Sequence, residues 1–391
     1  MEKKSKTTLF DGGFGKYVLP GILLQSVLIG GGYATGREVI SYGAKFGAKG
    51  WIAGIAILIG FSIMSIVTFE FVRVFKTYNY KDFMKTLIGK AAILYDLIYI
   101  PLVIIILAVM ASATGEIVNK TIGLNYWVGV IAVILAVGIL NFYGTKVIEK
   151  FETYGTVALY AAYIIFGVLA ISKNIGNIQH VLVTGDTSFV EGGSSIRYII
   201  WTGIVYVAYN LIVYPASFAS LKRQTTRKES VISGIIAGVL MTVPWFITYF
   251  AFMGYYPQEA ILASSVPWLD ILYQVGGTWT IVLFGVVMGW TLIETSTGVL
   301  HAFVERVNST LSDYGKETLT RGQSAVLTIV VLVIATVFSK FGIIDLIAKG
   351  YEAMSYGTMI VYALPLLTIG IYKIVKESKN KQNTEDTEKA N

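Results

Sequence analysis

The sequence predicts an all-α integral membrane protein with about ten transmembrane helices. We expect two inverted repeats of five helices, with the first and sixth helices broken. Of the 391 residues, 55% are hydrophobic and only 14% are charged, whereas soluble domains carry about 25% charged residues. Apolar runs of about 20 residues, the length that crosses a bilayer, recur along the chain. Two of these runs contain residues that disfavour a continuous helix.

Ten apolar segments follow one another and are the expected spans. In order, they cover residues 16–42, 51–75, 92–118, 126–142, 150–171, 196–220, 231–253, 279–304, 325–338 and 343–374. Basic residues concentrate at the amino terminus, after every second span and in the tail, which places both termini in the cytoplasm of a plasma-membrane protein. We expect one domain, 1–375, with repeats at about 14–173 and 195–375, and a disordered tail at 376–391.

Composition and motifs argue against several other functions. The net charge is +7, but the basic residues lie between spans, so we expect no nucleic-acid partner. The absence of cysteine excludes disulfides and thiolate chemistry. No cofactor motif is present, and His180 and His301 are expected on opposite sides of the membrane, so we do not expect an enzyme. The remaining partners are the lipid bilayer and a small-molecule substrate.

The first apolar segment contains the most unusual stretch of the chain. Residues 28–42 read L-I-G-G-G-Y-A-T-G-R-E-V-I-S-Y. Glycine weakens a helix, and ionised side chains at membrane depth are costly unless they face protein or water. The glycines at 30–32 and Gly36, followed by Arg37 and Glu38, therefore predict two half-helices with exposed backbone groups between them. Such a break can hold an ion or a zwitterion at the centre of the bilayer.

The sixth segment is the expected counterpart of the first. A repeat of five spans must be inverted, because its second copy begins on the opposite side of the membrane. The centre of the sixth segment reads W-T-G-I-V-Y-V-A-Y-N-L-I-V-Y-P-A, with Asn210 near the midplane. Pro215 removes a backbone donor and disturbs the preceding turn. Two interrupted spans at matching positions point to a transporter site.

This layout resembles the LeuT fold of the amino acid–polyamine–organocation superfamily. The run G-G-G-Y-A-T-G-R-E-V resembles G-A-G-F-A-(S/T)-G-(Q/R)-E of the YkvI-type bacterial membrane proteins, which are sparsely characterised and regarded as amino acid permeases. The sequence departs from the superfamily at the sixth span. Many members have glycine at that break, whereas here Gly203 lies upstream and the centre is 207–210, Val-Ala-Tyr-Asn.

The resemblance implies a substrate between the two breaks, flanked by spans three and eight. Backbone amides of the first break would bind a carboxylate, assisted by the positive end of the following half-helix. Side chains of spans three and six would complete the pocket. The expected substrate-binding residues are Gly31, Gly32, Ala34, Thr35, Gly36, Met110, Tyr206, Tyr209 and Asn210.

Span eight carries polar residues at three- and four-residue steps, which share one helical face. In the fold that the chain resembles, hydroxyls of span eight and carbonyls of span one bind sodium, a hard cation that prefers oxygen ligands. The resemblance implies a sodium ion at Gly30, Tyr33, Thr291 and Thr295. Glu294 departs from the hydroxyl pattern and makes a proton or another cation an alternative. The expected ion-coupling residues are Gly30, Tyr33, Thr291, Glu294, Thr295 and Ser296.

Arg37 and Glu38 begin the outer half of span one. Either can pair with Glu294, Asp345 or Glu352, or face the outer vestibule as a gate. We therefore predict a secondary active transporter of a small amino-acid-like solute, coupled to sodium or protons. Spans one, two, six and seven would rock against spans three, four, eight and nine. The alternative is a ligand-sensing membrane receptor subunit on the same fold, as in spore germinant receptors, which binds without flux.

Overall fold

The computed structural model describes residues 12–143 and 145–390, and this part of the chain contains helices and no strand. Seven described helices are long and apolar enough to cross a membrane, or eight if the bent pair 159–173 and 175–184 forms one span. Two shorter apolar helices cover Phe14–Leu28 and Tyr126–Leu140. The predicted all-helical membrane fold is confirmed, while the number of ten spans remains a prediction.

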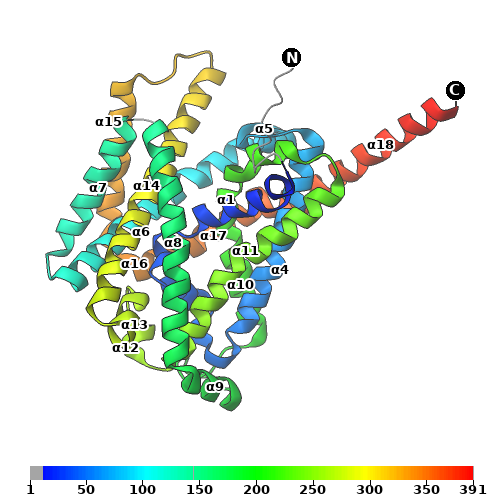
Figure 1. The fold of residues 1–391 in the computed structure, drawn as a ribbon. Helices are drawn as coiled ribbons and strands as arrows, with labels where there is room; N and C mark the ends of the chain where they lie inside the picture. Colours follow the sequence, from blue (N-terminus) through cyan, green and yellow to red (C-terminus); the bar gives the residue numbers. More distant parts are fainter. Residues whose placement is uncertain (1–11, 144, 391) are drawn as a thin grey trace, which may run out of the picture.

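The helices succeed one another with short connections (Figure 1). Their bounds are α1 (Leu19–Leu28), α2 (Gly31–Ala34), α3 (Arg37–Tyr42), α4 (Trp51–Phe75), α5 (Tyr80–Ile88), α6 (Ile93–Ile122), α7 (Tyr126–Tyr143), α8 (Thr145–Lys173), α9 (Ile175–Thr184), α10 (Ile196–Asn210), α11 (Arg227–Met253), α12 (Glu259–Leu262), α13 (Pro267–Val275), α14 (Thr278–Asp313), α15 (Arg321–Ser339), α16 (Gly342–Asp345), α17 (Glu352–Thr358) and α18 (Ile371–Ala390). The π-helix η2 (Phe14–Val18) precedes α1, and the 3₁₀-helix η5 (Leu211–Arg223) follows α10.

Polar caps fix the beginnings of three long helices. The Ser195 hydroxyl accepts the Tyr198 amide at the start of α10. Thr226 with Glu229, and Thr320 with Gln323, form capping boxes at the starts of α11 and α15. Each cap satisfies amides that have no partner within the helix, so these polar residues determine where the apolar helices start.

The long helices form two groups. In the first group, α11 packs against α1 and α4, and α10 packs against α4. In the second group, α6 packs against α7, α14 and α15, and α8 packs against α14. Figure 1 shows α7, α14 and α15 on one side of the molecule and α4, α10 and α11 on the other. The interrupted helix α1–α3 belongs to the first group, and α2 also contacts α6 and α14 of the second.

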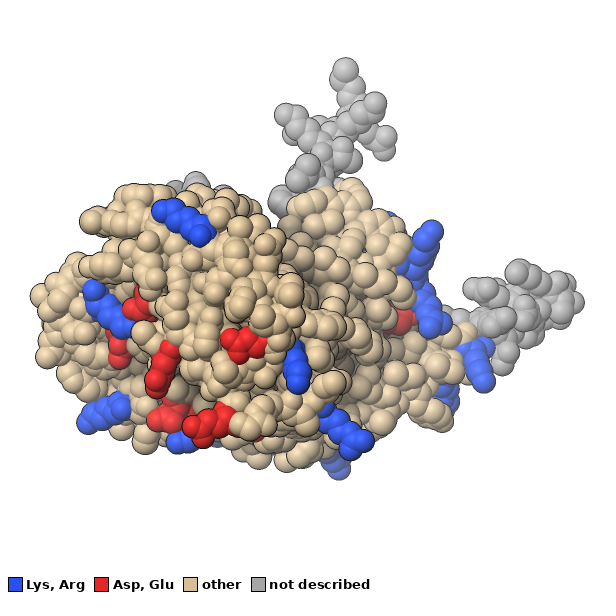
Figure 2. All heavy atoms as spheres, turned by 90° about the horizontal axis from the view of Figure 1, so that it is seen from below, with Lys and Arg blue, Asp and Glu red and all other residues tan. Residues whose placement is uncertain are grey.

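The outer surface is apolar along the long helices. Ile131, Leu135 and Ile139 of α7 are 53%, 59% and 56% exposed at four-residue spacing, so they form one stripe on the helix. Exposed apolar surface of this extent is typical of contact with lipid. Figure 2 views the end of the molecule that carries α9, α12 and α13, and it shows acidic and basic side chains dispersed among uncharged residues. We call this the α13 end and the opposite one the α5 end.

Two elements differ from the sequence prediction. The sixth segment is not interrupted by extended residues, because α10 passes at Leu211 directly into the 3₁₀-helix η5. Pro215 lacks the N–H for a helical bond, and the tighter 3₁₀ winding accommodates it. The tail expected to be disordered is helical, since α18 continues through Ala390. Its lysines and glutamates and its one glutamine are good helix formers.

Candidate solute-binding site

The first apolar segment is divided into three short helices. Helix α1 ends at Leu28, and Ile29 has φ −75° and ψ 75°. Gly30 is extended, with φ −98° and ψ −168°, and α2 begins at the next residue. Gly36 has a left-handed φ of 87°, which favours glycine. A Cβ at Gly36 would also lie 2.9 Å from Trp268 Cδ1. Glycine therefore permits both the turn and the close packing.

The backbone amides after this interruption have partners within the chain. The Gly31 amide donates to Met110 Sδ over 2.9 Å. The amides of Ala34, Thr35 and Gly36 donate to the carbonyls of Gly30, Gly31 and Tyr33 over 2.7, 3.1 and 2.8 Å. The turn α2 supplies the carbonyl partners of the Thr35 and Gly36 amides, while the Gly31 amide is bonded outside the turn. These four amides are therefore engaged within the chain, and the expectation that the amides of this interruption, Gly32 included, bind a substrate carboxylate stays a prediction.

A carboxylate of the chain itself lies beside α2. The Glu38 side chain is 4% exposed, and its Oε2 accepts a 2.6 Å hydrogen bond from the Tyr209 hydroxyl. The Tyr33 amide is a further donor to this carboxylate. A Cβ at Gly32 would collide with Glu38 Oε1. Glu38 therefore faces inward from α3 and does not form the outer gate that the sequence suggested.

Residues of span six and the following segments surround Glu38. The rings of Tyr209 and Tyr351 stack with centroids 4.7 Å apart, and Tyr206 packs edge-on against Tyr209 at 5.5 Å. The Asn210 side-chain amide donates to the Tyr206 carbonyl over 2.8 Å. The predicted residues Tyr209 and Asn210 therefore do meet the first interruption. Tyr351 was missed, because a tyrosine in an apolar segment carries no distinguishing signal.

Two adjoining cavities lie along the interruption. A small one of about 40 Å³ is lined mainly by apolar residues, together with Gly30, Glu38, Tyr209, Asn210 and Thr295. A larger one of about 480 Å³ shares apolar lining residues with it. The larger cavity extends to Tyr80 of α5 and Arg306 of α14, so it forms a vestibule toward the α5 end. The shared lining residues are Val27, Ile106, Ile212, Val213, Thr295 and Val299.

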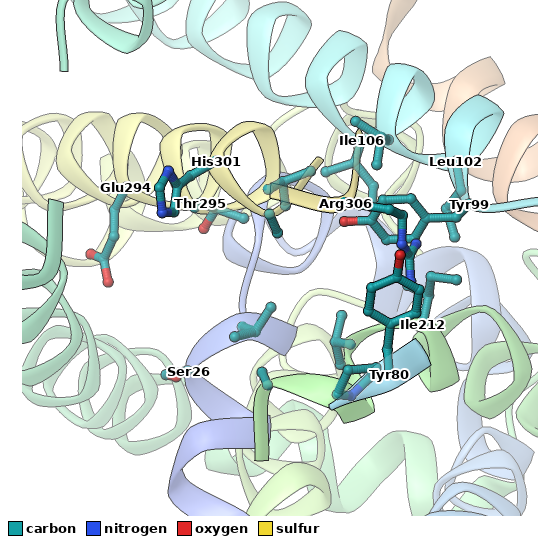
Figure 3. A pocket seen from close by; sticks show the side chains of 18 residues that line it. Ser26, Tyr80, Tyr99, Leu102, Ile106, Ile212, Glu294, Thr295, His301 and Arg306 are labelled. Carbon is teal, nitrogen blue, oxygen red and sulfur yellow. The ribbon is translucent and has the colours of Figure 1, made fainter. Parts of the chain in front are cut away.

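Arg306 is a vestibule residue that the sequence did not single out. Its guanidinium carbon lies 3.5 Å from the centroid of the Tyr80 ring and 3.6 Å from that of Tyr99. Figure 3 shows Arg306 between these two rings. Its Nε also lies 3.2 Å from Asp96 Oδ1. The stacking on the two rings and the ion pair with Asp96 hold the positive charge of Arg306 at the vestibule. In the sequence, Arg306 is an arginine at the end of an apolar segment. This pattern does not distinguish a vestibule residue from a solvated one.

The expected sodium ligands converge only in part. Thr295 lines both cavities, and its Cγ2 would lie 3.5 Å from a Cβ at Gly30. In contrast, the Thr291 hydroxyl donates to Val287 O of its own helix over 2.8 Å. The Tyr33 carbonyl accepts the Tyr163 hydroxyl over 2.8 Å. Gly30 and Thr295 are therefore the two residues of the set that lie next to each other, and a sodium ion held by their oxygens stays a prediction.

The two other expected coupling residues lie on the same helix. Glu294 is 8% exposed and lines the vestibule, and Ser296 is 3% exposed. In Figure 3 the carboxylate of Glu294 points away from Arg306. Neither residue lines the small cavity. Glu294 and Glu38 are thus two separate buried carboxylates, one in the vestibule and one in the small cavity.

The interruption is covered at the α13 end by the capping segment, residues 254–276. Arg37 Nη1 donates to the carbonyls of Leu262 and Ser264 over 2.7 and 3.1 Å. The Trp268 amide donates to the Thr35 carbonyl over 3.1 Å. These bonds join α2 and α3 to α12 and α13. Arg37 therefore belongs to a closed contact at the α13 end, and its partners are carbonyls and not the predicted carboxylates.

The remaining two gate residues lie elsewhere. Asp345 forms a 2.9 Å ion pair with Lys349 on the same helical segment, and both side chains are exposed. Glu352 is also exposed, and its Oε1 accepts the Tyr356 hydroxyl over 3.2 Å. Exposed ion pairs contribute little stability. Neither residue contacts Arg37 through any hydrogen bond or ion pair recorded for the described residues.

The fold is similar to those of solved membrane transporters. A Na+-coupled sialic acid symporter in a substrate-bound outward-open state has a TM-score of 0.57 and 17% identity, covering 94% of this chain and 82% of that chain. MhsT in complex with L-phenylalanine has a TM-score of 0.62 and 14% identity, covering 92% and 97%. The manganese transporter of Eremococcus coleocola has a TM-score of 0.54 and 13% identity, covering 94% and 80%.

These similarities establish the fold, and the LeuT-like architecture predicted from the sequence is confirmed. No protein-family model matches the chain, and no curated protein sequence matches it. The resemblance to YkvI-type proteins therefore stays a prediction.

Proposed function

We propose that the chain is a secondary active transporter that moves a small solute across the plasma membrane by alternating access. The observation that carries this proposal is a pathway that leads to the site from one end of the molecule and is covered at the other end. The vestibule reaches the helix interruption from the α5 end, while the capping segment and Arg37 cover the interruption at the α13 end. Such a site, accessible from one side at a time, is the structural requirement of alternating access.

The arrangement corresponds to an inward-open state if both termini are cytoplasmic, as the distribution of basic residues predicts. The group of α1, α4, α10 and α11 would then rock against the group of α6, α7, α14 and α15. Movement would separate Arg37 from the capping segment and close the vestibule around Arg306. The solved transporters with this fold support the mechanism by analogy. The proposal also includes the YkvI-type family assignment and a driving ion that is either sodium or a proton.

Reconstituted protein tests the proposal. Purified full-length chain in proteoliposomes is given labelled amino acids, amines and carboxylates with an inward sodium gradient, an inward proton gradient or neither. We expect accumulation of at least one solute that requires one of the gradients and collapses with the matching ionophore. Binding without accumulation in any arm would contradict transport and favour the receptor alternative.

A further inference from the structure

Glu38 is an acidic residue without an ionic partner among the described residues. It is buried in the small cavity, and none of the ion pairs in the described part of the chain includes it. Of the described residues that line this cavity, Glu38 is the one with a charged side chain. Burying an unpaired carboxylate is costly, so such a group takes up a proton or a cation.

The hydrogen bonds to Glu38 orient the carboxylate without neutralising it. The Tyr209 hydroxyl and the Tyr33 amide are neutral donors. The absence of a side chain at Gly32 leaves room for the carboxylate beside α2. A preorganised acceptor is therefore held beside the small cavity, at the position where the sequence suggested that a substrate carboxylate would bind. Two like charges cannot share this position.

The other walls of the small cavity suit an organic cation. The rings of Tyr209 and Tyr351 line it, and aromatic rings attract ammonium groups. Asn210 lines it too, and because its Nδ2 is bonded to the Tyr206 carbonyl, its side-chain oxygen is the group left to accept a hydrogen bond. Met110 adds a polarisable thioether.

The sizes of the two cavities divide the solute between them. A volume of about 40 Å³ accommodates only a few heavy atoms, the size of a protonated amine with its first carbon. The adjoining vestibule holds about 480 Å³, and the residues shared by both cavities are mainly valine and isoleucine. An apolar tail attached to the amine would therefore extend into the vestibule.

We propose that the transported solute is a small amine with an apolar tail, and that Glu38 is the counter-charge for its ammonium group. This inference rests on the proposed transport function and names its substrate class. Glu38 and Tyr209 bind the ammonium, and a carboxylate on the solute is not required. The prediction differs from an amino acid permease, in which the first interruption receives the carboxylate of the substrate.

Three solutes with closely related branched side chains test the inference on the unmodified protein. Isoamylamine carries only the amine, leucine carries both charged groups, and 4-methylpentanoate carries only the carboxylate. Their affinities for the purified full-length chain are measured by calorimetry and their uptake by proteoliposomes. We expect isoamylamine to bind at least as tightly as leucine, and at least tenfold (~1.4 kcal/mol) more tightly than 4-methylpentanoate. Equal or tighter binding of the carboxylate would overturn the inference.

Two substitutions test whether Glu38 is the residue that binds the amine. Glu38→Gln is expected to weaken isoamylamine binding by about tenfold or more, because it removes the charged acceptor. Tyr209→Phe is expected to weaken it less, since the carboxylate remains. Glu352→Gln is the matched control, because Glu352 is an exposed carboxylate beside Tyr351, and it should leave the affinity unchanged. Retention of amine affinity in Glu38→Gln would overturn the assignment and leave Glu38 as a proton carrier.

The outcomes separate this inference from the transport proposal. Gradient-driven uptake of solutes that lack an amine, with no uptake of amines, would overturn only the substrate class. Preferential binding of a divalent metal that is lost in Glu38→Gln would also overturn the amine as the solute. It would retain Glu38 as a binding residue. Failure of every solute to accumulate under every gradient would overturn transport itself.

Discussion

The close approach of Gly32 and Glu38 is the most restrictive contact at the residue scale. A methyl group at position 32 would collide with Glu38 and lie 2.8 Å from Ile347 Cδ1. Gly32→Ala should therefore displace the carboxylate, lower the free energy of unfolding by about 1–3 kcal/mol and reduce uptake. Gly285→Ala is the control, since a Cβ there meets nothing within 4 Å. Thermal unfolding and uptake of both variants check this, and equal effects would contradict the packing argument.

Thr295 and Thr291 are a matched pair for the coupling ion. Both lie on α14, but Thr295 lines the cavities next to Gly30, whereas the Thr291 hydroxyl bonds to its own helix. If sodium drives transport, Thr295→Val should raise the sodium concentration for half-maximal uptake by about tenfold, the effect of one lost oxygen contact. Thr291→Val should change it little. A larger effect at Thr291 would show that the ion lies elsewhere on the helix.

The sequence predicted which residues lie near the site better than it predicted their roles. Tyr209, Asn210, Met110 and Gly30 do line the small cavity. Glu38 was expected either in a pair with another span or in an outer gate, because it begins the outer half of span one. Its inward direction depends on the left-handed residue Gly36, which rotates α3 relative to α2, and the sequence gives no direct measure of that rotation.

At the scale of elements, the capping segment is the contact that transport must break. Arg37 joins α3 to the carbonyls at 262 and 264. Arg37→Ala should therefore open the α13 end and expose Ser41, which is 9% accessible. The chain has no cysteine, so Ser41→Cys provides a single thiol. We expect several-fold faster modification of this thiol in Arg37→Ala, and no change in Arg197→Ala, which removes an exposed arginine near the start of α10.

The glycine run indicated the interrupted first helix, because three consecutive glycines weaken any helix. The sequence did not predict that the residues after the interruption form a helical turn, α2, whose carbonyls accept the Thr35 and Gly36 amides. Nor did it predict the short helices α12 and α13, whose position depends on tertiary contacts such as the Trp268 bond to Thr35. These contacts join parts of the chain more than 200 residues apart, which local patterns do not encode.

At the scale of the whole molecule, the two helix groups meet at the interrupted helix. α1 packs against α11 of the first group, while α2 contacts α6 and α14 of the second. The composition was sufficient to predict the membrane class, and the spacing of apolar runs was sufficient to predict the order of the helices. The division into two groups is a property of packing, and it was expected from the resemblance to the LeuT fold and not from any single residue.

The most direct test of alternating access measures the accessibility of both ends at once. Single cysteines at Ala302, which lines the vestibule, and at Ser41, which is buried toward the α13 end, are modified with a membrane-impermeant thiol reagent in oriented vesicles. Without solute, we predict rapid modification of Ala302→Cys from the α5 side and protection of Ser41→Cys. With the driving ion and solute, Ala302→Cys should become protected as Ser41→Cys becomes reactive from the α13 side. Two rates that rise and fall together, or that stay constant while solute accumulates, would contradict the mechanism.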